Sequence, residues 1–248
     1  MDTSLPEGSV FLRFVLDAHT HSLSCGHAYS TVTENARQAA QIGLSCIAFT
    51  DHGPAMPHTA SDWFFGNLRM IPRQVEGVEI LTGVELNILD TDGKIDLPQS
   101  MIERLAVVIA SLHGPCIRPG SARENTQALI RAMENPAIKI IGHPCDPHYP
   151  LELEALVDAA ARTGTFLEVN NHSLEPGSGR DGGDRDVLRM LELCKAARHP
   201  VVLGSDAHFH TAVGDFALAE GLLAQAGLPD ELVLNIDIKR FKNALRIA

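Results

Sequence analysis

The chain of 248 residues is 45% hydrophobic and 21% charged, which is the ordinary balance of a globular enzyme. Its formal net charge of −11 disfavours nucleic acid as a partner, because binding a phosphate backbone calls for a broad basic surface. No uninterrupted apolar run reaches about 18 residues and the N-terminus lacks the order of a secretion signal, so we expect no membrane partner and a cytoplasmic location.

Short apolar or β-branched runs alternate along the chain with longer segments of helical periodicity. The expected strands are, in chain order, residues 14–21, 44–52, 78–87, 105–114, 137–145, 165–171 and 200–208. The expected helices are residues 31–43, 98–105, 125–135, 151–164, 185–199, 215–227 and 238–247. Ser30, Thr31 or Thr33 can cap the first of these helices, and Gly43 suits its end.

This alternation predicts the class of fold. Near-continuous apolar strands separated by helices are typical of a parallel sheet that is covered on both faces. Seven strand–helix units in a chain of 248 residues favour a complete or distorted barrel over an open, doubly wound sheet. No stretch rich in Pro, Gly and Ser divides the chain, so we expect one domain.

Polar side chains stand at the end of each expected strand. They are His19 and His21, Asp51 and His52, Glu85, His113, His143, Asn170, and Asp206 with His208. In parallel barrels and open α/β sheets, binding sites form where the strands end. The sequence therefore predicts that these side chains gather around one rim.

The residue types at this rim favour a metal site. Alternate residues of a strand point the same way, so His19 and His21 can share one site, and Asp206 and His208 repeat that spacing. A single histidine at a strand end is usually structural, but packing many imidazoles together without a partner is costly. Imidazole and carboxylate suit zinc, manganese or iron. Glu85 and Asp206 as an acid/base pair is the weaker interpretation, because it leaves the histidines unexplained.

The five cysteines give no sign of a second kind of metal site. Their number is odd and no C-x-x-C pair occurs, which argues against a disulfide framework and a zinc ribbon. Cys25, Cys116 and Cys145 lie near histidines in the sequence. We expect them to be small buried hydrophobic side chains rather than thiolate ligands.

Five motifs, in this order, resemble the signatures of the polymerase and histidinol phosphatase family, the PHP domain: DAHTH (17–21), TDH (50–52), GVE (83–85), HP (143–144) and SDAH (205–208). The branch that the chain resembles most is the small stand-alone bacterial phosphatases of the YcdX type, through HAYST (27–31), TDHGP (50–54), NTQA (125–128) and LGSDAH (203–208). The resemblance implies a single PHP domain over residues 1–248, folded as a distorted (β/α)7 TIM-like barrel.

The resemblance also implies a centre of three divalent metal ions, with nine residues at the ligand positions. The three ligand sets are His19, His21, Glu85 and Asp206; Glu85 as a bridge with His113 and His143; and His27, His52 and His208. Zinc is the expected ion, and manganese and iron are the alternatives. Asp17 and Asp51 are expected to orient imidazole N–H groups from outside the ligand shell.

The expected reaction is hydrolysis of a small phosphate monoester by a metal-activated water. Arg69, Arg118 and His172 are the candidate substrate contacts, each equally compatible with a solvated side chain. Two alternatives stay open: a 3′–5′ exonuclease of PHP type acting on short single strands, and a metal-binding protein without turnover. A homo-oligomer also stays open.

The longest connection between expected strands, residues 53–77, carries three adjacent aromatic side chains that bear on the exonuclease alternative. They are Trp63, Phe64 and Phe65. Aromatic side chains in such a loop usually pack it against the barrel, but they can also stack on a nucleic-acid base. We expect packing.

Overall fold

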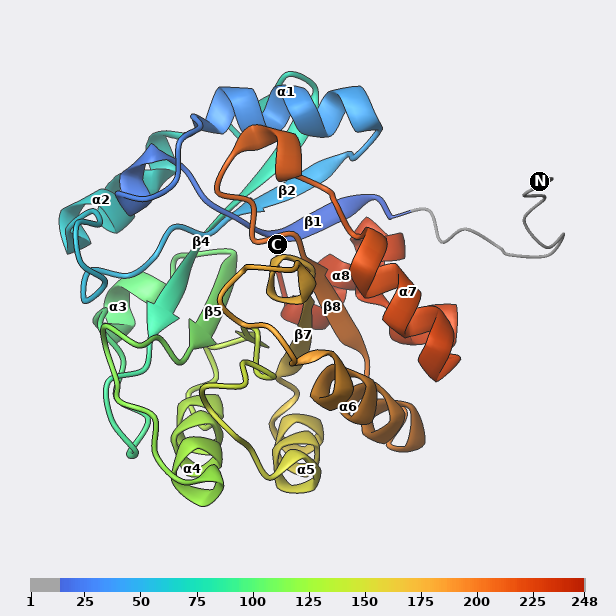
Figure 1. Ribbon diagram of the computed structural model, residues 1–248. Helices are drawn as coiled ribbons and strands as arrows, with labels where there is room; N and C mark the ends of the chain where they lie inside the picture. Colours follow the sequence, from blue (N-terminus) through green and yellow to red (C-terminus); the bar gives the residue numbers. More distant parts are fainter. Residues whose placement is uncertain (1–13, 248) are drawn as a thin grey trace, which may run out of the picture.

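The computed structural model describes residues 14–247, which form a nearly closed barrel of parallel strands ringed by helices (Figure 1). The strands of the barrel are β1 (Leu16–Thr20), β2 (Cys46–Phe49), β4 (Val78–Asn87), β5 (Val107–Ser111), β6 (Ile140–Ile141), β7 (Phe166–Asn170) and β8 (Val201–Gly204). They pair in that order, and a short β3 (Gln74–Val75) lies antiparallel to β4. A parallel bridge between Thr20 and Ala207 joins the last strand to the first. The expected distorted TIM-like barrel is confirmed.

Helices cover the outside of the barrel (Figure 1). They are α1 (Val32–Ile42), α2 (Asp62–Asn67), α3 (Gln99–Ile102), α4 (Ala122–Met133), α5 (Leu153–Thr163), α6 (Asp184–Ala196), α7 (Ala217–Ala226) and α8 (Ile238–Leu245). All seven expected helices are present, and α2 is an addition. Within residues 14–247 no helix has the length and apolar character that crossing a membrane requires.

Local capping fixes where two of these helices begin. The Thr31 hydroxyl accepts from the Glu34 N–H and the Glu34 carboxylate accepts from the Thr31 N–H, so α1 starts at the capping box that the sequence offers. Gly43, at a φ of 86°, ends α1 as expected. A second box, Ser121 with Glu124, starts α4 three residues before the expected position 125.

The inward-facing side chains change from apolar to polar along each strand. Near the start of the strands, Leu16, Cys46, Leu81, Val107, Phe166 and Val202 form one buried cluster. Phe241 and Leu245 of α8 belong to the same cluster, so α8 packs across the end of the barrel at which the strands begin. Because alternate residues share a face, Leu81 is followed inward by Gly83 and Glu85. The apolar plug therefore fills one end of the barrel and leaves the other end polar.

Candidate metal centre

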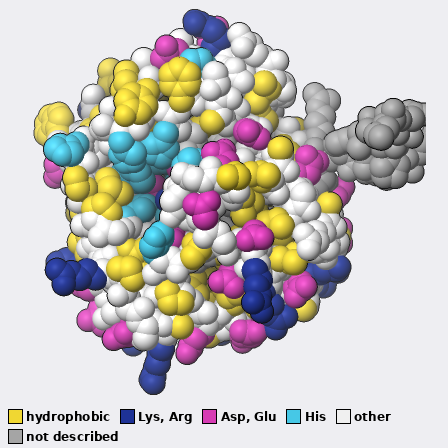
Figure 2. Space-filling model, in the orientation of Figure 1, with side chains coloured by type: hydrophobic (Ala, Val, Ile, Leu, Met, Phe, Trp, Pro, Cys, Tyr) yellow, Lys and Arg dark blue, Asp and Glu magenta, His cyan; other side chains and the backbone are white. Residues whose placement is uncertain are grey.

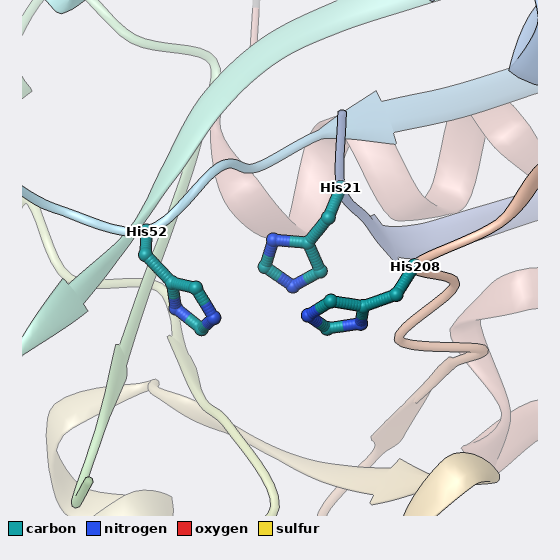
Figure 3. A group of neighbouring side chains, drawn as sticks. All are labelled: His21, His52 and His208. Carbon is teal, nitrogen blue, oxygen red and sulfur yellow. The ribbon is translucent and has the colours of Figure 1, made fainter. Parts of the chain in front are cut away.

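Histidines and carboxylates from many strands meet inside the polar end of the barrel. Figure 3 shows three of them, His21, His52 and His208, with their rings directed into one space. One ligand atom from each of these three lies within 4.8 Å of the other two. Three further groups meet the same criterion and share members with the first: His19, His21 and Glu85; His52, Glu85 and His113; and His21, Cys25 and Asp51.

Glu85 lies at the middle of this cluster and is fully buried. Its Oε1 lies 2.8 Å from His143 Nε2 and 3.1 Å from His113 Nε2. Its Oε2 lies 2.7 Å from His52 Nδ1 and 3.3 Å from His19 Nε2. His21 Nε2 also lies 3.5 Å from Oε2. Each carboxylate oxygen thus faces a different group of imidazoles, which is the arrangement that a bridging carboxylate needs.

Asp206 is the second carboxylate of the cluster. Its Oδ1 lies 3.0 Å from His21 Nε2 and 3.7 Å from His19 Nε2. Its backbone φ is 57° and that of His143 is 29°. Residues other than glycine rarely adopt a positive φ. Backbone hydrogen bonds hold both: Asp206 N–H donates to His19 O at 3.0 Å, and His143 N–H donates to a Glu168 oxygen at 2.7 Å. Strained backbone held in this way is typical of functional sites.

His27 occupies the outermost position. Its ring centroid lies 5.0 Å from that of His52 and 4.7 Å from that of His208. The structure therefore brings together all nine of the residues expected as metal ligands. His21 lies between the expected sets, because its ring is 4.5 Å from His52 and 4.4 Å from His208 as well as 4.9 Å from His19.

Hydrogen bonds at the outer nitrogen fix the tautomer of several rings. His19 Nδ1 lies 2.7 Å from a Glu168 oxygen and His113 Nδ1 lies 2.7 Å from Asn87 Oδ1. His27 Nδ1 and His208 Nδ1 each face a backbone carbonyl, at 3.0 and 2.9 Å. These acceptors require the proton on Nδ1, so the lone pair of each Nε2 points into the cluster.

Pairs of Nε2 atoms consequently lie close to one another beside the carboxylates. His19 Nε2 and His21 Nε2 are 3.0 Å apart, and His113 Nε2 and His143 Nε2 are 3.3 Å apart. Within the described residues, seven buried side-chain atoms make no hydrogen bond of acceptable geometry, and four of them belong to the cluster: His52 Nδ1, Glu85 Oε2, Asp206 Oδ1 and His208 Nε2. His52 Nδ1 and Glu85 Oε2 lie 2.7 Å apart without that geometry. Such a set is costly unless cations lie between its members, so the residues fit divalent metal ions.

The protonation states agree with this fit. Burial alone would raise the pKa values of Glu85 and Asp206, but the surrounding imidazoles hold both well below the usual range. Burial lowers the pKa of His113 to about 4, and burial with the neighbouring His208 and His52 rings holds that of His21 well below its ordinary value. Burial alone would lower the pKa of His19, but the carboxylates of Glu168, Glu85 and Asp206 raise it well above its ordinary value. The carboxylates and the His21 and His113 rings thus have the forms that bind metal, and a cation bound at His19 would displace its proton.

Two residues that support the cluster were missed from the sequence. Glu168 holds the His19 ring and the His143 backbone, and Asn87 holds the His113 ring. Strand periodicity could have indicated both, because Glu168 lies two residues before Asn170 and Asn87 two residues after Glu85 on the same strand face.

The roles expected for Asp17 and Asp51 need correction. Asp17 accepts hydrogen bonds from the backbone N–H groups of His19, Ser205 and Gly214, so it fixes the junction of the first and last strands rather than an imidazole ring. Asp51 lies 4.0 Å from His21 Nδ1, so it does not contact that ring directly. Cys25 connects the two: its thiol donates to Asp51 at 2.9 Å and its sulfur lies 3.0 Å from His21 Nδ1.

The cysteines are free, and Cys25 differs from the apolar side chain that the sequence predicts. Cys25 and Cys145 are buried and Cys116 is partly buried. The Cys25 sulfur also accepts from the His52 N–H at 3.2 Å, so it takes part in the polar network.

An open pocket of about 730 Å³ lies over the nine histidines and carboxylates, called the metal cluster after the ions that these residues fit. His27, His52, His113, Asp206 and His208 lie along it, and Met56, Pro57, Leu112 and Pro115 add apolar surface. Figure 2 shows the histidines gathered on this face of the molecule. The size suits a small-molecule substrate.

Arg180, which was also missed from the sequence, reaches into this pocket. Its Nη1 lies 3.2 Å from Asp206 Oδ2 and 2.9 Å from the Ser173 hydroxyl, and its Nε lies 3.5 Å from Asp146. Its side chain is 19% exposed. It comes from the glycine-rich segment 177–183, which has no periodicity that could place it.

Of the three residues expected to contact substrate, only one lines the pocket over the metal cluster. His172 lines the pocket, with its ring 6.3 Å from that of His208 and Nδ1 2.9 Å from Glu175. Arg118 is exposed in the loop after β5 and is not among the residues that line the pocket. Arg69 was predicted wrongly: it lines a pocket with Glu79, Leu81 and Lys139, at the opposite end of the barrel.

The aromatic side chains of the long connection also differ from one another. Phe65 is buried and Phe64 makes an edge contact with Phe49, so the expectation of packing is confirmed for these two. It is wrong for Trp63, which is 82% exposed. Trp63 lies on a separate groove with Met70 and Val75, away from the pocket over the metal cluster.

Comparison with known proteins agrees with this picture. Residues 17–172 match the family model of the PHP domain. The chain is 46% identical over 236 residues to a probable phosphatase of Thermoanaerobacter sp. (strain X514), covering 95% of this chain and 96% of the relative. It is 38% identical over 235 residues to a probable phosphatase of Clostridium acetobutylicum, with 95% and 96% covered.

Solved structures share the fold at low sequence identity. Histidinol phosphate phosphatase from Lactococcus lactis, solved with zinc, L-histidinol and phosphate, superposes with a TM-score of 0.60 at 17% identity, covering 86% of this chain and 94% of the other. A putative histidinol phosphatase from Listeria monocytogenes gives 0.58 at 15% identity, with 81% and 97% covered.

Proposed function

This chain belongs to the PHP domain family, and from that premise we propose that it hydrolyses small phosphate monoesters at a centre of three divalent metal ions. The coarser statement, a metal-dependent phosphatase, rests on the family, on relatives named probable phosphatases and on the clusters of histidine and carboxylate. The number of ions, their identity and the class of substrate are the proposal.

The observation that carries the proposal is the convergence of imidazole nitrogens and carboxylate oxygens on one space. Nε2 of His19 and His21, and Nε2 of His113 and His143, approach within 3.0 and 3.3 Å beside ionised carboxylates. Since Glu85 directs one oxygen to each group, we assign it as the bridge between two ions. His27, His52 and His208 provide the third position.

Divalent ions at such a centre polarise phosphoryl oxygens and lower the pKa of coordinated water to about 7. Residues outside the ligand set orient the imidazole rings. Glu168 and Asn87 hold the rings of His19 and His113 with Nε2 turned inward. Zinc is the proposed ion and manganese or iron the alternatives, because neutral imidazole with carboxylate accepts all three.

Arg180 is the proposed anchor for the phosphoryl group. It is the one arginine or lysine among the described residues that line the pocket. A guanidinium fork matches phosphate oxygens in two parallel hydrogen bonds, and its present partner Asp206 holds it beside the proposed centre. His172 stands on the same wall and is placed to contact the rest of the substrate.

We also propose that residues 1–248 form a single PHP domain. Asp206 and His208 lie beyond the family match at 17–172, yet they complete the cluster. The His21 N–H donates to Ala207 O at 3.0 Å, which ties the end of the chain's last strand to the first.

The exonuclease alternative is disfavoured by the position of Trp63. A single strand is commonly held by bases stacked on aromatic rings along a basic groove. Trp63 lies outside the pocket over the metal cluster, and that pocket has Arg180 as its lysine or arginine.

The test compares two substrates on one preparation loaded with zinc or manganese. Hydrolysis of p-nitrophenyl phosphate should clearly exceed cleavage of single-stranded DNA. If single-stranded DNA is the better substrate, the exonuclease replaces the phosphatase. If neither substrate turns over while metal is retained, the metal-binding protein without turnover replaces both.

A further inference from the structure

A second pocket, the basal pocket, lies at the end of the barrel where the strands begin. Its volume is about 670 Å³. Its walls come from the segment 68–73, from the first half of β4 (Glu79 to Thr82), from the residues that precede β5 and β6, and from the end of α8. The metal cluster stands at the other end of the same strands, so the two sites are separate.

Positive charge is concentrated in the basal pocket. Five basic side chains line it: Arg69, Arg73, Arg104, Lys139 and Arg246. They are five of only 20 lysines and arginines in a chain with a formal net charge of −11. Within residues 14–247 none of the five forms an ion pair.

The acidic side chains in the basal pocket do not balance this charge. Two of the chain's 31 acidic residues line it, Glu79 and Glu103. Glu79 already binds Lys242, with Nζ 2.7 Å from Oε1. Glu103 accepts from the Gln99 amide at 2.9 Å. The pocket therefore carries a net positive charge without a counter-ion from the described chain.

Lys139 shows the effect of placing these positive charges close together. Its Nζ donates a hydrogen bond to the Pro136 carbonyl at 2.6 Å. A carbonyl is neutral, so this contact leaves the positive charge of Lys139 without a counter-ion. Burial, and then the neighbouring Arg246 guanidinium, lower the pKa of Lys139. An anion bound between these two side chains would remove the repulsion.

The residue types indicate what kind of anion fits. Four of the five cations are arginines, whose planar guanidinium groups match phosphate oxygens in pairs of hydrogen bonds. Five charges spread over several elements exceed what one phosphate can contact. The lining also includes aliphatic surface from Ile71, Leu81, Leu105, Leu245 and Ile247, which suits an uncharged organic portion. The volume lies in the range of small-molecule sites, about 300–1,000 Å³.

We propose that the basal pocket binds a small organic molecule that carries two or more phosphate groups, such as a nucleoside di- or triphosphate. This binding does not depend on the reaction at the metal cluster.

The test measures binding and activity on the metal-loaded enzyme. An ADP analogue with a methylene bridge between its phosphorus atoms is titrated by calorimetry, and its inhibition of p-nitrophenyl phosphate hydrolysis is measured in parallel. The basal variant carries Arg104→Gln and Arg246→Gln. The matched control carries Arg123→Gln and Arg162→Gln, two exposed helical arginines outside the pocket.

We expect the wild-type enzyme and the control to bind the analogue at a site that does not compete with p-nitrophenyl phosphate. The basal variant should bind there at least 10-fold more weakly, with kcat/KM for p-nitrophenyl phosphate within twofold of the wild type. Equal affinity in the basal variant overturns the proposal. So does equal weakening in the control, or binding that is wholly competitive with p-nitrophenyl phosphate. If the protein proves to lack phosphatase activity, the calorimetric comparison still decides.

Discussion

Glu168 offers a sharp test of how the cluster is held, because it touches two candidate ligands from outside. One oxygen lies 2.7 Å from His19 Nδ1 and the other accepts from the His143 N–H at 2.7 Å. In Glu168→Gln the amide oxygen can keep one of these hydrogen bonds. The amide nitrogen then faces the other N–H group, so one charge-assisted hydrogen bond is lost.

The size of the effect follows from that loss. A hydrogen bond to a charged group contributes about 1.5–3 kcal/mol. Removing a side chain that orients a ligand typically lowers metal affinity or activity roughly 10- to 100-fold, which agrees with that energy. We therefore expect the metal affinity of Glu168→Gln to fall roughly 10- to 100-fold.

The assay is competition for zinc against a chromogenic chelator, with circular dichroism to check that the variant is folded. The matched control is Glu152→Gln, an exposed glutamate whose side chain makes no capping hydrogen bond to α5. Metal affinity within twofold of the wild type in folded Glu168→Gln would refute the reasoning. An equal loss in Glu152→Gln would refute it as well.

Three further predictions follow from single positions. Glu85→Gln should lose more than one equivalent of metal together with activity, because each Glu85 oxygen faces a separate group of imidazoles; elemental analysis showing full metal content would rule out the bridge. Arg180→Gln should lower kcat/KM for p-nitrophenyl phosphate roughly 10- to 100-fold through a higher KM while metal content stays intact, as one charged hydrogen bond to phosphate predicts; an unchanged KM would exclude it as the anchor. Gly204→Ala should lower the free energy of unfolding by about 1–3 kcal/mol, because the added Cβ would collide with the Glu168 carboxylate and lie 2.6 Å from His19 Cβ. Its control is Gly221→Ala in α7, where the Cβ meets nothing within 4 Å and should stabilise the helix by about 0.5–1 kcal/mol; urea denaturation that ranks the two equally would contradict this account.

The sequence predicted the barrel and the gathering of histidines because both depend on periodic patterns. Apolar runs mark the strands, and a polar residue at the end of a parallel strand must lie at the common rim. Glu85 and Asp206 were found in this way. Glu168 was overlooked because the prediction stopped at Asn170, the polar residue that ends the same strand. Glu168 lies two residues earlier on the same face, as Glu85 does relative to Asn87.

Loop residues were harder to place. Arg69 was expected at the rim because it follows a strand that ends there. The connection from β2 must, however, return to the start of β4 at the opposite end, and Arg69 lies late on that return, in a 3-10 turn shortly before β3. Arg180 could not be placed, because glycines at positive φ at positions 177, 179 and 182 give its segment a path that no periodicity describes.

The central claim is a centre of three ions built around Glu85. Anomalous diffraction at the zinc edge, from crystals of the zinc-loaded protein, tests it most directly. The account predicts three zinc peaks, two of them in contact with different oxygens of Glu85 and the third among His27, His52 and His208. A single peak, or peaks that do not touch Glu85, would contradict it.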